Sequence, residues 1–105
     1  MPQVSPVIES KRQELEALCK KYRVKRLYVF GSAVRDDFDP ARSDLDFLVE
    51  FLPVPRGGLA DQYFGLLERL QDLFGRHVDL VERAAIRNKY LRREANMTKV
   101  GLYAA

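Results

Sequence analysis

The sequence has no tryptophan, and it has only one cysteine, Cys19, and one histidine, His77, among 105 residues. A single thiol cannot form an internal disulfide, which fits a reducing compartment. Structural zinc sites normally combine several cysteine and histidine ligands, so we expect no such site here. Cys19 falls on the apolar side of an expected helix, a position that predicts a buried structural thiol rather than a nucleophile.

Long apolar runs are also missing. No stretch approaches the roughly 20 apolar residues that span a bilayer, and the first ten residues lack the basic-then-apolar pattern of a signal peptide. We therefore expect no membrane contact and a cytoplasmic location. With 47% hydrophobic and 31% charged residues, the chain has the composition of a globular protein, and its length fits a single domain over residues 1–105.

Charge is distributed unevenly along the chain. Residues 36–50 hold six acids and one base, whereas residues 1–26 and 84–105 hold mainly bases. An acidic block between basic ends indicates cation binding in the middle and anion contacts around it. For the terminal bases, solvated faces are the simpler interpretation. The bases near the C-terminus have no interleaved stacking aromatics, so we do not expect direct nucleic-acid binding.

The spacing of apolar residues predicts alternating helices and strands. Helical periodicity predicts helices over Val7–Tyr22, Leu59–Phe74 and, more weakly, Ala84–Ala95, with a short helix or turn over Ala33–Asp37. Strand composition predicts strands over Val24–Phe30, Leu45–Leu52 and Val78–Val81, and a strand or docked extension over Val100–Ala105. This order predicts an α/β fold in which helices pack against a small mixed sheet.

A glycine–serine pair follows the strand that ends at Phe30. Backbone N–H groups at a turn after a strand favour a bound phosphate. Gly31 has no Cβ to keep a phosphate away, and Ser32 adds a hydroxyl donor. Most such pairs are ordinary turns, so this pair predicts a phosphate-binding loop only in combination with neighbouring motifs.

Three aspartates fall at the predicted strands. Asp44 and Asp46 are two residues apart, so both side chains lie on the same side of a strand. Two carboxylates on one face repel each other, and a divalent cation such as Mg²⁺ bound between them would remove this repulsion. The alternative to a metal site is a solvated strand edge or a helix cap. Asp79 joins them if the two strands are neighbours; otherwise a salt bridge with Arg76 or Arg83 would explain it. Together these groups predict two-metal phosphoryl transfer.

Phe30-Gly31-Ser32, the segment Ser43-Asp44-Leu45-Asp46-Phe47-Leu48-Val49 and Val78-Asp79-Leu80-Val81 resemble the DNA polymerase beta-type nucleotidyltransferases. More narrowly, they resemble the minimal nucleotidyltransferases that are antitoxin partners of HEPN toxins. The resemblance implies that Asp44, Asp46 and Asp79 hold two Mg²⁺ ions and that Gly31 and Ser32 bind phosphate. It also implies a nucleotide contact for Arg35. From its position alone, two residues before Asp44, Arg42 is a further candidate for a phosphate contact.

The same resemblance implies a function. We expect the chain to transfer AMP from ATP to a tyrosine hydroxyl of a cognate HEPN toxin, and to form a hetero-oligomer with that toxin. One alternative is an antitoxin that neutralises by binding alone. Another is a transferase acting on a small molecule or an RNA end, although such enzymes usually need a further acceptor-binding domain.

Overall fold

The computed structural model describes residues 6–31, 44–53, 58–82 and 99–105. The described elements are helices α1 (Pro6–Glu9), α2 (Arg12–Lys21) and α3 (Leu59–Phe74), and strands β1 (Val24–Phe30), β2 (Leu45–Phe51), β3 (Val78–Glu82) and β4 (Val100–Ala104). The helices predicted over residues 33–37 and 84–95 lie outside these ranges. Within the described ranges, no helix is both long and apolar enough to cross a membrane.

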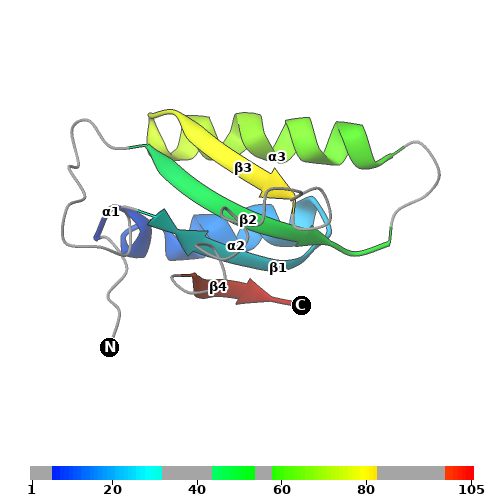
Figure 1. The fold of residues 1–105 in the computed structure, drawn as a ribbon, viewed down its shortest axis with the longest axis horizontal. Helices are drawn as coiled ribbons and strands as arrows, with labels where there is room; N and C mark the ends of the chain where they lie inside the picture. Colours follow the sequence, from blue (N-terminus) through cyan, green and yellow to red (C-terminus); the bar gives the residue numbers. More distant parts are fainter. Residues whose placement is uncertain (1–5, 32–43, 54–57, 83–98) are drawn as a thin grey trace.

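The four strands form one mixed sheet in the order β3-β2-β1-β4 (Figure 1). Strand β1 pairs antiparallel with β2 and with β4, whereas β2 and β3 are parallel. Parallel neighbours need a crossover connection, which α3 supplies between β2 and β3. The predicted mixed sheet with helices packed against it is therefore confirmed, and the C-terminal segment is a strand rather than a docked extension.

The single helix predicted over residues 7–22 is wrong, because the structure has two helices separated by a turn at Ser10 and Lys11. The Ser10 hydroxyl donates to the carbonyl of Val7 at 3.0 Å, and the Lys11 N–H donates to the carbonyl of Ile8. Serine competes in this way with regular helical bonding. The apolar periodicity still identified the buried side chains, since it reports which face is buried and not whether the helix is continuous.

Helix α3 begins and ends at the residues predicted from its apolar stripe. Gly75 ends it in the left-handed conformation with φ 62°, and its N–H donates to the carbonyl of Gln71 at 2.8 Å. This is the usual glycine termination of a helix. The turn directs the chain from α3 into β3, so it sets where β3 enters the sheet.

The main core lies between the helices and one face of the sheet. Alternate residues of β2, such as Phe47 and Val49, are fully buried there, together with Leu66 and Leu70 of α3. The rings of Phe47 and Phe74 stack with their centroids 5.9 Å apart. This packing fixes α3 against the sheet, and therefore fixes the position of β3 beside β2.

Candidate active site

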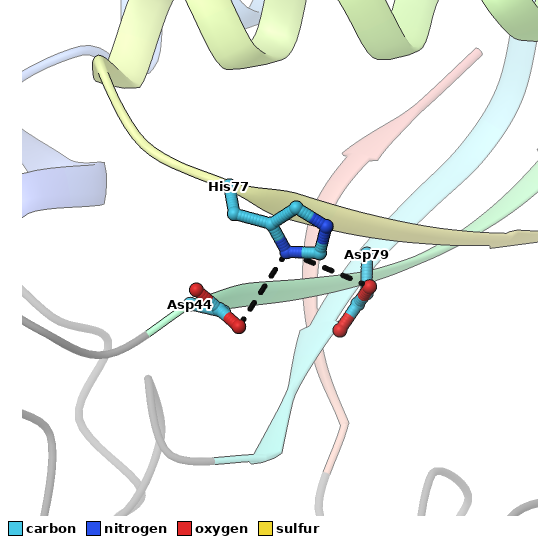
Figure 2. A group of neighbouring side chains, drawn as sticks. All are labelled: Asp44, His77 and Asp79. Carbon is cyan, nitrogen blue, oxygen red and sulfur yellow. Dashed lines mark ion pairs between the residues drawn. The ribbon is translucent and has the colours of Figure 1, made fainter.

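Side chains from the starts of β2 and β3 meet at one end of the sheet (Figure 2). The parallel register pairs Leu45 with Val78, so the residues just before them, Asp44 and His77, are neighbours. His77 and Asp79 are two residues apart in an extended segment and share a face. The His77 Nδ1 lies 3.4 Å from an Asp44 carboxylate oxygen and 3.7 Å from an Asp79 oxygen. The cluster therefore contains two of the three predicted metal-binding aspartates.

Asp46 occupies the centre of this edge, on a strand between two others. Its register partners are Phe30 at the end of β1 and Asp79 on β3. A Cβ built on Gly31 would lie 2.5 Å from Asp46 Oδ2, so the carboxylate sits directly against the glycine backbone. Gly31 also has a φ of +73°, which L side chains rarely adopt. The predicted phosphate-binding glycine and the second predicted aspartate are thus in contact.

A cavity of about 490 Å³ lies beside these groups. Its polar wall includes Asp46, His77 and Asp79, and its apolar wall includes Phe30 and Leu67. Sites for small ligands typically have volumes of roughly 300–1,000 Å³ and combine apolar walls with a few polar groups. The cavity therefore has the size and lining that a nucleotide-sized ligand needs.

Tyr63 of α3 also lines this cavity. Its hydroxyl donates a hydrogen bond to the carbonyl of Leu80. Burial raises the pKa of the Tyr63 hydroxyl, and the carboxylates of Asp79 and Glu82 raise it further. The hydroxyl therefore keeps its proton at neutral pH, so it acts as a structural donor.

The other predicted nucleotide contacts, Ser32, Arg35 and Arg42, lie outside the described residues, so the structure does not place them. The described ion pair of Asp79 is with His77. Arg83, one of the alternative partners of Asp79, is outside the described ranges.

Sequence reasoning missed His77 as a member of the site. It was considered only as an argument against zinc, because a lone histidine is a poor sign of a metal site. The signal was its position two residues before Asp79 in a predicted strand, which places both side chains on one face. The same spacing places Asp44 and Asp46 on one face of their strand.

The residues present fit a divalent cation. Ligand atoms of Asp44, His77 and Asp79 all lie within 4.8 Å of one another. An octahedral ion with bonds of about 2.1 Å places neighbouring ligands roughly 3 Å apart and opposite ligands roughly 4.2 Å apart. Small side-chain rotations would bring these donors to such distances, and more than half of each of the three side chains is exposed.

Known proteins with similar sequences identify the family of this chain. The family model described as "Nucleotidyltransferase domain" matches residues 11–100. The Methanocaldococcus jannaschii protein named "Putative protein adenylyltransferase MJ0128" is 37% identical over 93 residues, covering 89% of this chain and 91% of its own.

Solved structures with the same fold include one described as "Structure of putative minimal nucleotidyltransferase". It aligns with a TM-score of 0.71 and 28% identity over 89% of this chain and 90% of its own. A chain in the complex of a tri-AMPylated Shewanella oneidensis HEPN toxin with MNT antitoxin aligns with a TM-score of 0.64 and 17% identity, over 92% of this chain and 72% of its own. The aspartate-bearing strands, the glycine beside them and the sequence match over residues 11–100 lead to one conclusion: this chain belongs to the nucleotidyltransferase domain family.

Proposed function

We propose that this nucleotidyltransferase transfers AMP from ATP to a tyrosine hydroxyl of a HEPN toxin and thereby neutralises the toxin. The observation that carries the proposal is the placement of three aspartates at one end of the sheet, where Asp46 and Asp79 line the cavity and Asp44 lies beside His77. Asp44 and Asp79 converge from parallel strands, and Asp46 lies against Gly31. The name of the M. jannaschii relative and the fold shared with a chain of the AMPylated toxin complex support this substrate class.

The three aspartates hold two Mg²⁺ ions in this proposal. Bound Mg²⁺ would offset the negative charge of the triphosphate and lower the pKa of the acceptor hydroxyl. The phenolic oxygen of the toxin forms a bond to the α-phosphorus of ATP while the bond from that phosphorus to the bridging oxygen breaks. Pyrophosphate leaves with the electron pair, and the phenolic proton passes to water.

The segment after β1 anchors the nucleotide. Gly31 and Ser32 offer backbone N–H groups and a hydroxyl to phosphate oxygens. Arg35 and Arg42 add charge-assisted contacts, for which the planar guanidinium is well suited. The close contact between Gly31 and Asp46 supports this arrangement, since it places the glycine backbone next to a metal-binding carboxylate.

A complex with the toxin is part of this proposal. The fold shared with a chain of the complex of a HEPN toxin with MNT antitoxin supports it. In the proposed complex the toxin presents its own tyrosine, and the two proteins form a hetero-oligomer. We propose that residues 1–105 act in this complex as a single domain in the cytoplasm.

The test uses the full chain together with the partner protein that co-purifies with it. The complex is incubated with Mg²⁺ and ATP labelled at the α-phosphate, and the partner is analysed by mass spectrometry. We expect AMP on a partner tyrosine with the wild-type chain. Asp44→Asn combined with Asp79→Asn should abolish transfer but leave partner binding intact, because both side chains are exposed. Asp72→Asn, an exposed carboxylate on α3, is the matched control and should transfer normally.

Two other results would contradict the proposal. In the first, the partner binds stoichiometrically but carries no label at any Mg²⁺ concentration, and the double variant still controls the toxin. This result would identify an antitoxin that acts by binding alone. Label found on RNA ends or on a small molecule instead of the partner would identify a different acceptor.

A further inference from the structure

The described contacts of the His77 side chain include two long ion pairs, to Asp44 and Asp79. More than half of its side chain is exposed, at 59%. Its Nδ1 is 3.4 Å and 3.7 Å from the two carboxylate oxygens, which is longer than the roughly 2.7–3.2 Å of a good N–H···O hydrogen bond. The nitrogen therefore faces the space between the carboxylates, without close bonding to either (Figure 2).

We infer that His77 Nδ1 is a third protein ligand of the divalent cation held by Asp44 and Asp79, and that it shifts the preference of this site from Mg²⁺ towards first-row transition-metal dications. This inference rests on the proposed metal-binding role of the two aspartates. It goes beyond that role because the three-aspartate arrangement alone supplies only oxygen ligands.

The chemistry of the donors explains the preference. Mg²⁺ is a hard cation that binds almost exclusively to oxygen and keeps several waters. Imidazole nitrogen is a softer donor that suits transition metals, whose affinity for nitrogen ligands exceeds that of Mg²⁺. One nitrogen between two carboxylates therefore stabilises an ion such as Mn²⁺ more than it stabilises Mg²⁺.

The strand backbones hold the three donor residues, Asp44, His77 and Asp79, close together. The parallel register of β2 and β3 holds the Asp44 and His77 backbones side by side, and Asp79 is on the same strand as His77. Only side-chain rotation is needed to bring all three donors to one ion, since their ligand atoms already lie within 4.8 Å of one another. No rearrangement of the sheet is required.

The experiment measures binding of Mn²⁺ alone to the full chain by electron paramagnetic resonance, with Mg²⁺ as competitor. The variants are His77→Gln, Asp44→Asn and the control Asp72→Asn. We expect His77→Gln to weaken Mn²⁺ binding by about 10-fold, at the lower end of the effects seen when groups around a metal are altered. Mg²⁺ binding should change by less than about 3-fold, so the Mn²⁺/Mg²⁺ preference falls. Pulsed measurements should detect coupling between Mn²⁺ and an imidazole nitrogen in the wild type and not in His77→Gln.

The outcomes separate this inference from the function proposed above. In one outcome, Asp44→Asn weakens Mn²⁺ binding, His77→Gln binds Mn²⁺ like the wild type, and neither the wild type nor His77→Gln gives a nitrogen signal. His77 is then not a ligand and the inference is overturned, but the aspartate site stands. If Asp44→Asn binds Mn²⁺ as well as the wild type, or Asp72→Asn loses as much affinity as Asp44→Asn, the aspartate site itself is wrong and both proposals are overturned. Circular dichroism of each variant checks that it is folded.

Discussion

Two glycines with positive φ occupy different surroundings in this protein. A Cβ on Gly31 would meet Asp46 Oδ2 at 2.5 Å, whereas a Cβ on Gly75 would have nothing within 4 Å. Their φ values are similar, at +73° and +62°. Comparing these two glycines therefore separates two effects of a side chain: the free-energy cost of a left-handed backbone, and the steric conflict with Asp46 in the candidate site.

Replacing each glycine by alanine tests this difference. Gly75→Ala should lower the free energy of unfolding by about 1–2 kcal/mol, the usual cost of a left-handed L residue, and leave ATP binding unchanged. Gly31→Ala should cost at least as much and also weaken ATP binding, because Asp46 must move. Urea unfolding and calorimetric titration with Mg²⁺ and ATP measure the two effects. Equal ATP affinity in both variants would show that the contact between Gly31 and Asp46 is unimportant.

Cys19 is fully buried on α2, and burial, followed by the nearby charge of Glu16, raises the pKa of its thiol to about 12. At pH 8 only on the order of 10⁻⁴ of the thiol is then ionised, and the thiolate is the reactive form. We expect iodoacetamide to modify Cys19 very slowly in the native protein and rapidly in urea. Rapid native labelling would show that the helix opens easily.

The same raised pKa predicts a pH dependence of stability. The folded pKa lies above the ordinary value of 9.0, so the unfolded chain loses the thiol proton first as pH rises. Stability from this group is complete below pH 9 and is lost as pH rises towards 12. The free energy of unfolding of the wild type should therefore fall more steeply over this pH range than that of Cys19→Ala. The variant is the control, because it keeps every other titrating group.

At the scale of elements, the exposed edge of β3 is protected by α3. The Tyr63 hydroxyl bonds to the Leu80 carbonyl, and the Gln71 side-chain oxygen accepts from the Val78 N–H at 3.4 Å. The His77 carbonyl faces β2, where it accepts from the Leu45 N–H. The backbone groups of Val78 and Leu80 alternate with it along the strand, so they face the other side of β3. Covering an edge in this way prevents pairing with another chain and keeps β3 in register.

Tyr63→Phe tests this protection. It leaves the Leu80 carbonyl without its hydroxyl donor, so the free energy of unfolding should fall by about 1 kcal/mol. Tyr103→Phe on β4 is the matched control, since the described residues show no hydrogen bond from that hydroxyl. Chemical unfolding compares the two variants. A loss in Tyr103→Phe equal to that in Tyr63→Phe would mean that the edge contact contributes nothing specific.

The helices and strands also show how much of the secondary structure local sequence patterns predict. The bounds of α3 and β1 agree with the prediction because a long apolar stripe and a β-branched run are strong local signals. The break between α1 and α2 was not foreseen, since it depends on the Ser10 side chain competing for backbone carbonyls. The predicted roles of Ser32, Arg35 and Arg42 stay predictions, because these residues lie outside the described ranges.

At the scale of the whole molecule, the candidate site depends on the junction between two parallel strands. The core contacts of α3 hold β3 beside β2, so a ligand that binds across this junction should stabilise the entire fold. Binding to the native state alone adds about 2.7 kcal/mol at a ligand concentration 100 times the dissociation constant.

We therefore expect Mg²⁺ with ATP to raise the melting temperature of the wild type by several degrees. Asp44→Asn combined with Asp79→Asn should remove the shift, and Asp72→Asn should keep it. Differential scanning calorimetry measures all three. An unchanged shift in the double variant would place nucleotide binding elsewhere on the protein.

The sequence by itself determined the types of the described helices and strands and their buried faces, because these depend on local spacing. It also predicted Asp44, Asp46 and Asp79 as site residues, and their roles stay predictions. It did not determine which strands are neighbours or in which register. Only the tertiary structure decided that Asp44 meets His77 and that Asp46 lies between Gly31 and Asp79. The reason is physical: the register of parallel strands is set by the packing of α3 across the sheet, and that packing joins residues far apart in the chain.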